Sequence, residues 1–228
     1  MTLIRSVLFA LVFYLGCIVF VGLAGLSVPF GTKAIVGASR RWALWHRFCA
    51  RHVLGLRAEF DRPLPEGVYI YAFKHESMFE TIETLAWFDH PAVVFKRELL
   101  DIPVWGWVAR AHGVIPVDRD SGSAAVRLML KAGKQAIADG RAIVIFPEGT
   151  RVPHGQSPQL GAGLAGMYRL LGLPIVPIAL DSGLYSPKRS FLKKSGIIHL
   201  KVGEIIPTGL SREEVEARVH SAINALNG

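Results

Sequence analysis

The stretch AIVIFPEGTR, residues 142–151, joins a strongly apolar run to a tight polar turn. The apolar residues 142–146 predict a buried β-strand, and the proline and glycine that follow predict a turn at its end. The turn presents Arg151, whose planar guanidinium can hold a phosphate through two hydrogen bonds. Because ligands of α/β sheets bind beyond the carboxyl ends of the strands, this turn is a candidate binding site. A plain surface turn with a solvated arginine is the alternative interpretation.

On both sides of this stretch, short apolar runs alternate with helical stretches. Further strands are predicted at 68–73, 92–95, 113–117, 174–180 and 196–203. Helices are predicted near 77–88, 121–139 and 160–172, and a last helix opens at Ser211 with Glu214 in the spacing of a capping box. Strands that alternate with helices predict an α/β fold with a mixed, largely parallel sheet flanked by helices.

The composition favours a negatively charged partner and a membrane. Hydrophobic residues make up 51% of the 228 residues and charged residues only 19%, so the chain is apolar for a soluble protein of this size. The net charge of +8 suits nucleic acid, an anionic membrane surface or a phosphorylated substrate, and charge alone does not choose among them. The two cysteines, Cys17 and Cys49, have neither zinc-site nor redox spacing, which favours a reducing compartment.

The N-terminus carries much of the apolar excess. Residues 3–30 contain a single charge, Arg5, and exceed the roughly 20 apolar residues that cross a bilayer. A signal peptide is the rival interpretation, but the run is longer than a signal core and no A-x-A cleavage site follows. Basic residues crowd the far side of the run: Lys33, Arg40, Arg41, Arg47 and Arg51. By the positive-inside rule we expect an uncleaved anchor with the rest of the chain in the cytoplasm.

Residues 33–55 predict a second membrane-associated helix. Its apolar side on a helical wheel is formed by Ile35, Trp42, Trp45, Cys49 and Val53, and arginines fall on the opposite side. This pattern suits a helix in the headgroup layer. A surface helix packed on the domain, or a hairpin with the first run that dips into one leaflet, fits the pattern as well. The chain is thus divided into an anchor (1–30), an amphipathic helix or linker (31–57) and an α/β domain (58–228).

A histidine and an acid follow the predicted strand 68–73. His75 and Glu80 could act as a general base and the carboxylate that fixes its tautomer. Residues five apart on a helix face different directions, so contact requires His75 in the loop and Glu80 in the second turn. The spacing alone is weak, because His199 and Glu204 share it. That second pair lies on or near a strand, where an odd spacing turns the side chains to opposite faces.

Two further sequence patterns have competing interpretations. Lys96 and Arg97, at the end of another predicted strand, could hold the same phosphate as Arg151 or form a solvated charge cluster. Residues 161–166 match G-x-G-x-x-G, with Asp181 about twenty residues later, the outline of a dinucleotide site. The segment before them is a turn-rich loop rather than a strand, which disfavours nicotinamide binding.

The chain also lacks a G-x-S-x-G nucleophile elbow, so the sequence gives no sign of a serine nucleophile that would form a covalent acyl-enzyme.

Four blocks in order resemble the glycerolipid acyltransferase family, and within it the bacterial 1-acylglycerol-3-phosphate acyltransferases. They are HESMFE at 75–80, KRE at 96–98 with Pro103 and Gly106, FPEGTR at 146–151 and VPI at 176–178. The resemblance covers roughly residues 58–206, and FPEGTR is its most specific part. The family's usual acid after the histidine is aspartate, whereas this chain has Glu80. The resemblance also implies a glycerol-3-phosphate acyltransferase-like fold.

The resemblance implies a role for each matching residue. His75 would be the general base and Glu80 its orienting carboxylate. Arg151, Lys96 and Arg97 would bind the acceptor's phosphate, with Thr150 beside them. Glu148 and Gly149 would shape the acceptor pocket, and residues 176–178 would line the acyl or acceptor channel.

The resemblance predicts transfer of a fatty acyl group from an acyl thioester, acyl-CoA or acyl carrier protein, to lysophosphatidic acid. The product would be phosphatidic acid for phospholipid synthesis. No metal or other cofactor is expected, anionic membrane lipids are expected partners, and nucleic acid is not. The expected location is the bacterial inner membrane, with the catalytic domain in the cytoplasm. Glycerol 3-phosphate or another lysolipid is the alternative acceptor, and a non-catalytic membrane-binding module is the rival function.

Overall fold

The computed structural model describes residues 1–117, 123–161 and 163–227, and in them seven strands form one sheet. The strand order is β1-β7-β6-β2-β5-β3-β4. The strands are β1 (Leu56–Phe60), β2 (Ile70–Phe73), β3 (Ala92–Lys96), β4 (Ile115–Val117), β5 (Ile143–Ile145), β6 (Ile175–Leu180) and β7 (Gly196–Val202). Among these described strands, β6 and β7 pair antiparallel and the other neighbours pair parallel. The carboxyl ends of β2, β3, β5 and β6 therefore meet at one edge of the sheet.

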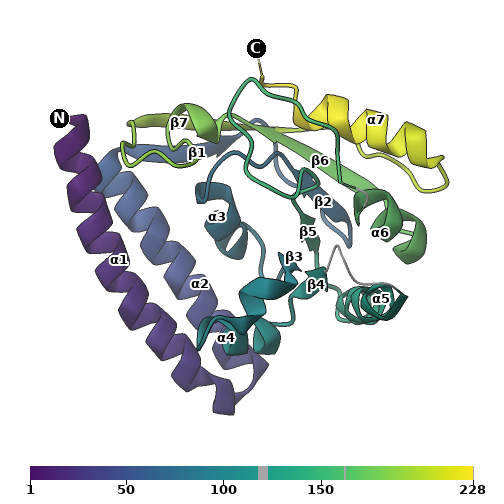
Figure 1. The fold of residues 1–228 in the computed structure, drawn as a ribbon, viewed down its shortest axis with the longest axis horizontal. Coiled ribbons are helices and arrows are strands. Elements are labelled where there is room, and N and C mark those ends of the chain that lie inside the picture. Colours follow the sequence, from purple (N-terminus) through teal and green to yellow (C-terminus); the bar gives the residue numbers. More distant parts are fainter. Residues whose placement is uncertain (118–122, 162, 228) are drawn as a thin grey trace.

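Helices cover both faces of the sheet (Figure 1). They are α1 (Thr2–Ser27), α2 (Thr32–Cys49), α3 (Phe79–Trp87), α4 (Trp105–His112), α5 (Ser123–Ala138), α6 (Gly163–Leu171) and α7 (Arg212–Ile223). Alternate residues of a strand point to opposite faces. In β2, Tyr71 and Phe73 join the core formed with α1, α2 and α3, whereas Ile70 and Ala72 join the core formed with α5, α6 and α7.

The two N-terminal helices form an antiparallel hairpin beside α3, as Figure 1 shows. A short 3₁₀ turn, Val28–Phe30, and Gly31 join them. Trp42 of α2 donates its indole N–H to Cys17 Sγ of α1 at 3.3 Å, and Trp45 lies against Phe20 of α1. Both tryptophans therefore contact α1 instead of forming a free interfacial face. Residues 33–55 therefore pair with α1 as a hairpin and also pack on α3 of the α/β domain.

The outer face of α1 is apolar and exposed. Leu11, Leu15 and Ile18 are exposed, whereas Phe9 and Phe13 on the inner face are buried. Within the described residues, one helical segment, Thr2–Phe30, has the length and hydropathy to cross a membrane. This exposed apolar face is consistent with membrane association.

The predicted strands are confirmed with small shifts at their ends, but β1 and α4 were not predicted. The predicted capping box is also present, since Ser211 Oγ accepts the backbone N–H of Glu214 and Glu214 accepts that of Ser211. The helix predicted at 121–139 is α5, and residues 121–122 lie outside the described part. Ala162 of the glycine-rich stretch also lies outside it.

Candidate active site

The histidine and the acid that follow β2 are in contact. Nδ1 of His75 lies 3.0 Å from Oε1 of Glu80, which confirms the expected pairing. The position of Glu80 differs from the expectation, because it lies in the first turn of α3 and not in the second. The helix begins at Phe79, two residues later than predicted, so the loop that carries His75 is longer and turns back toward the helix start.

Glu80 is fully buried and saturated with hydrogen-bond donors. Its Oε1 accepts the backbone N–H groups of Glu76 and Ser77, and its Oε2 accepts the hydroxyl of Ser182. An ionised carboxylate accepts hydrogen bonds and donates none. Nδ1 of His75 must therefore carry the hydrogen of this contact, which leaves the lone pair on Nε2. The Phe146 ring, 4.4 Å away between centroids, packs against the imidazole.

Glu148 of the FPEGTR turn binds the loop of His75. Its Oε2 accepts the backbone N–H of His75 at 2.9 Å, and its Oε1 accepts Lys74 Nζ at 2.6 Å. Lys74 and Glu148 are both buried, and Lys74 also donates to Gln156 O and to Asn224 Oδ1. Both carboxylate oxygens of Glu148 are thus used inside the protein, one of them to hold the backbone of His75.

The rest of the turn points Arg151 outward. Gly149 has a φ of 66°, a left-handed conformation that glycine adopts without steric cost, and its N–H bonds Phe146 O. Thr150 is exposed, and its hydroxyl accepts Lys188 Nζ at 3.1 Å. The N–H of Val152 bonds the carbonyl of His75 at 2.7 Å, so Arg151 adjoins a residue tied directly to the histidine loop.

Arg151 lines a cavity of about 220 Å³ beside the start of α3. Ser77, Met78 and Phe79 also line it, so it begins next to the histidine loop. Lys96 and Arg97 lie at the same edge of the sheet, at the end of β3. Neither is among the described residues that line this cavity, and Lys96 pairs loosely with Glu98 at 3.7 Å. Arg151 thus lies close to the histidine loop. Lys96 and Arg97 are exposed at the end of β3, outside the cavity.

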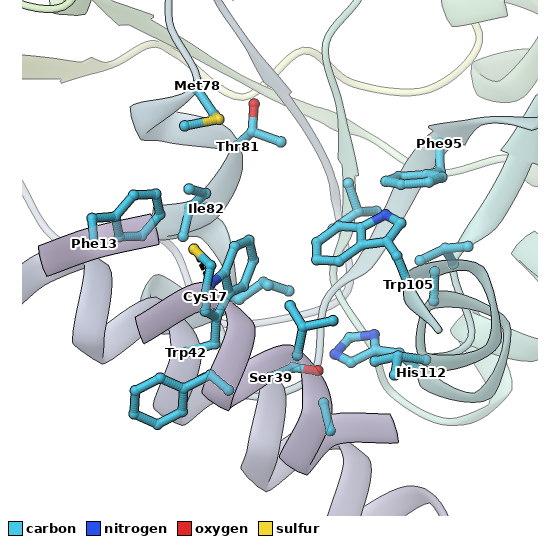
Figure 2. A pocket seen from close by; sticks show the side chains of 18 of the residues that line it. Phe13, Cys17, Ser39, Trp42, Met78, Thr81, Ile82, Phe95, Trp105 and His112 are labelled. Atoms are coloured by element: carbon cyan, nitrogen blue, oxygen red, sulfur yellow. Dashed lines mark hydrogen bonds between the residues drawn. The ribbon is translucent and has the colours of Figure 1, made fainter. Parts of the chain in front are cut away.

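A second cavity, of about 370 Å³ and almost entirely apolar, lies between the helical hairpin, α3 and α4. In Figure 2, Met78 and Thr81 lie at its upper end, and Ser39 and His112 lie at its lower end. Met78 lines both cavities. His112 adds no charge to the wall, because burial, together with the nearby His90 and Arg141, lowers its pKa to about 3. Residues 176–178, expected in a channel, are buried within β6 and line neither cavity.

The other histidine candidate has a different partner. His199 binds Asp181 through both its backbone N–H and its Nδ1, at 2.8 and 2.9 Å, whereas Glu204 contacts Arg62. Both oxygens of Asp181 thus contact His199 of β7. The glycine-rich stretch follows a loop and not a strand, so the dinucleotide-binding arrangement is not formed.

A third histidine–acid pair lies close to the first and was not found from the sequence. Nδ1 of His154 is 3.0 Å from Oε1 of Glu76, whose Oε2 accepts the backbone N–H of Gly183. Glu76 is fully buried, and burial raises its pKa to about 7 although the Gly183 N–H and His154 favour the charged form. Among the described residues, no group of three or more His, Cys, Asp or Glu side chains could hold a metal ion.

The sequence model of the Acyltransferase family matches residues 56–181, more than half of the chain. The chain belongs to this acyltransferase family. The matched region contains the His75–Glu80 pair, the Lys96–Arg97 pair and the FPEGTR turn.

Individual relatives of this acyltransferase agree with the family match. Over 165 residues it is 34% identical to the 1-acyl-sn-glycerol-3-phosphate acyltransferase of Pseudomonas aeruginosa, a match that spans 72% of this chain and 63% of that protein. It is 28% identical to human 1-acyl-sn-glycerol-3-phosphate acyltransferase beta over 189 residues, which are 80% of this chain and 68% of that protein.

The fold is also similar to a solved structure. The crystal structure of the 1-acyl-sn-glycerophosphate (LPA) acyltransferase PlsC from Thermotoga maritima superposes with a TM-score of 0.76. The match covers 100% of this chain and 96% of that chain at 22% sequence identity. This agreement includes the N-terminal hairpin, so the expected α/β fold with a mixed, largely parallel sheet is confirmed.

Proposed function

We propose that this acyltransferase moves a fatty acyl group from an acyl thioester to the free hydroxyl of 1-acyl-sn-glycerol 3-phosphate, which gives phosphatidic acid. The observation that carries the proposal is the contact of the partly exposed His75 with the buried Glu80 beside the Arg151 cavity. The pair supplies a base, and the cavity supplies a cation for a phosphate. The names of the relatives support lysophosphatidic acid as the acceptor.

The proposed reaction needs one base and no covalent enzyme intermediate. Nε2 of His75 removes the proton of the acceptor hydroxyl while its oxygen attacks the thioester carbonyl carbon. The tetrahedral intermediate then expels the thiolate, which takes the proton from His75. General-base assistance of this kind contributes about 10²–10⁴-fold in rate. Glu80 holds the ring in the required tautomer, and a phosphate bound by Arg151 would hold the hydroxyl beside it.

The apolar cavity suits the acyl chain of the donor. Its volume of about 370 Å³ lies within the usual range of ligand pockets, roughly 300–1,000 Å³, and its wall is aromatic and aliphatic. Met78 at the upper end is three residues from His75, so a chain in the cavity would place its thioester near the base. Acyl-CoA and acyl carrier protein are both proposed donors, and no metal or other cofactor takes part in the proposed steps.

The exposed apolar face of α1 supports a membrane location, which suits a reaction with a lipid acceptor and a lipid product. We infer that α1 lies in the bacterial inner membrane and that the catalytic domain faces the cytoplasm. Lys33 and the arginines lie on α2, which runs back along α1 toward the catalytic domain, and basic residues beside a membrane helix favour the cytoplasmic side. Anionic membrane lipids are the proposed surface partners, and nucleic acid is not proposed as one.

Thiol release with a panel of acceptors tests the proposal. Lysophosphatidic acid, glycerol 3-phosphate and lysophosphatidylcholine are each offered with acyl-CoA and with acyl carrier protein, in detergent. We expect rapid release with lysophosphatidic acid and a loss of about 10²–10⁴-fold in His75→Ala. His199→Ala is the matched control, because His199 of β7 makes a similar contact with Asp181 but its side chain is exposed and lines neither cavity, so the variant should keep full activity.

Each other outcome identifies a different function. Preference for glycerol 3-phosphate or lysophosphatidylcholine would change the acceptor but keep the reaction class. No release with any acceptor from folded protein, or equal release in His75→Ala, would favour a non-catalytic membrane-binding module.

A further inference from the structure

The cavity beside Arg151 is lined by two more cations from a distant loop. Residues 181–195 connect β6 to β7, and Arg189 and Lys193 of this loop line the cavity together with Arg151. The described lining includes no aspartate or glutamate. None of the three cations forms an ion pair with a described residue, and Lys193 Nζ donates only to the carbonyl of Ser190, at 2.7 Å.

The positive charges are close enough to affect one another. Lys193 is partly buried, and burial lowers the pKa of its ammonium, with a further decrease from the positive charge of Arg151. Like charges that share a partly buried site disfavour each other's charged forms. A bound anion would remove this cost, because it would be attracted to all three cations at once.

The loop is held in place before any ligand binds. Lys188 Nζ donates to Thr150 Oγ1 and to Arg151 O, at 3.1 and 2.8 Å. On the other side, the backbone N–H of Lys193 bonds Ser6 Oγ of α1 at 2.9 Å. Arg189 has a φ of 62°, which is unusual for a residue other than glycine and persists only where the surroundings fix it. The backbone that carries Arg189 and Lys193 is therefore held between the FPEGTR turn and α1.

Much of the remaining cavity lining is apolar. Phe9 and Ala10 of α1 line it, and Ser77 and Met78 line the end nearest His75. A ligand that fills this space needs a strongly anionic end, an apolar end and access from the side of α1. A lipid with a phosphate monoester meets all three requirements, since lysine and arginine are the usual phosphate-binding residues.

We propose that Arg189 and Lys193 complete, with Arg151, the binding site for the phosphate monoester of the lysolipid acceptor. The proposal rests on the proposed function and adds two binding residues outside the four sequence blocks. The phosphates of the acyl donor are the other source of the same chemistry, and the experiment separates the two.

The test compares Lys193→Met, Arg189→Gln and the double variant with Lys194→Met. Lys194 is the neighbouring cation, is exposed and does not line the cavity, so it is a matched control. The KM values for lysophosphatidic acid and for acyl-CoA are measured separately in mixed micelles. We expect each single variant to raise the KM for lysophosphatidic acid about 10- to 100-fold, with kcat and the donor KM within about threefold of wild type. The control should match wild type.

Monoacylglycerol, which has the same chain and hydroxyl without phosphate, gives a second readout. We expect wild type to prefer lysophosphatidic acid strongly, and the double variant to lose most of this preference because its use of monoacylglycerol is unchanged. A merely destabilised loop would lower turnover of both acceptors equally, which would overturn the proposal. An increase in the donor KM instead would assign the cations to the donor's phosphates.

Direct binding separates this proposal from the proposed function. Titration calorimetry of lysophosphatidic acid in detergent, on wild type and on the variants, requires no turnover. Binding that is weakened in Lys193→Met but not in Lys194→Met supports the site even if acyl transfer to this acceptor fails. Unchanged binding in the double variant overturns the site even if the enzyme transfers acyl groups.

Discussion

Oε1 of Glu80 accepts Nδ1–H of His75 at 3.0 Å and, in addition, the backbone N–H groups of Glu76 and Ser77. One oxygen atom therefore fixes both the imidazole ring and the loop that carries it. Ser182, beyond the end of β6, fixes the other oxygen. The proposed base and its support thus lie at the ends of two neighbouring parallel strands, β2 and β6.

We predict that Glu80→Asp lowers kcat although aspartate is the family's usual residue. The variant keeps the charge but loses one methylene, so its oxygen cannot reach three donors that surround the present position. A displacement of about 1 Å in such a site can cost roughly 100-fold in rate. Steady-state kinetics should give a reduced kcat with a nearly unchanged KM for the acceptor.

Glu80→Gln is the companion variant, because it keeps the length and loses the charge. It should reduce kcat as well, since the imidazolium formed during the reaction loses its counter-charge. Wild-type kcat in Glu80→Asp would mean that α3 shifts freely, which contradicts the tight packing described above.

Lys74→Met should destabilise the protein strongly. Lys74 and Glu148 are both buried and 2.6 Å apart, so removal of the lysine leaves an uncompensated carboxylate in the core. Breaking such a buried pair costs about 3–5 kcal/mol. Denaturant unfolding in detergent measures the change in the free energy of unfolding. The control is Arg212→Met, which removes an exposed pair with Glu216 and should change stability by less than about 0.5 kcal/mol. Similar stability of the two variants would contradict the prediction.

Ser39→Phe should shorten the acyl chain that the enzyme accepts. Ser39 lies at the end of the apolar cavity away from Met78, and a phenyl group there would occupy the space of the terminal methylenes (Figure 2). We expect kcat/KM for palmitoyl donors to fall about tenfold or more relative to decanoyl donors. A donor panel measures this ratio, with Thr81→Val at the other end as the control. An equal loss for all chain lengths would place the acyl chain elsewhere.

The sequence predicted the parts of the site that are local in the chain. His75 and Glu80 are five residues apart, and the strand before them together with the family's order of blocks selected them over His199 and Glu204. The apolar runs of β2, β5 and β6 were equally clear, because strands buried on both faces are continuous in hydrophobic residues. β1 has charged residues at alternate positions and pairs with β7, about 140 residues later. Its own sequence therefore does not indicate a strand.

The missed residues depend on distant contacts. The cluster of Lys188, Arg189, Lys193 and Lys194 is visible in the sequence as a dense basic stretch. Arg189 and Lys193 lie beside Arg151 because of the path that the chain takes from β6 to β7 and because of the contact with Ser6 of α1. Neither can be predicted from a local sequence pattern. Glu148 is similar, since its hydrogen bond to the backbone of His75 joins two blocks that are 73 residues apart.

Glu76 should make the protein less stable as the pH rises from about 4.5 to 7. Its pKa is raised from 4.5 to about 7 in the folded protein by burial, so between these values the folded state holds a proton that the unfolded state has released. Each such unit of pH lowers the free energy of unfolding by about 1.4 kcal/mol, to a total on the order of 3 kcal/mol. The contribution is fully present below pH 4.5 and is lost above pH 7.

Glu76→Gln removes this titration and keeps an oxygen for the Gly183 N–H. We therefore expect the variant to unfold at a midpoint near that of wild type at pH 5 and at a clearly higher midpoint at pH 8, because the wild type must then bury a charged carboxylate. Glu204→Gln, at an exposed position, should follow wild type at both values. A difference between Glu76→Gln and wild type that stays constant from pH 5 to pH 8 would mean that Glu76 is ionised throughout. In that case the contact with His154 would be a permanent ion pair.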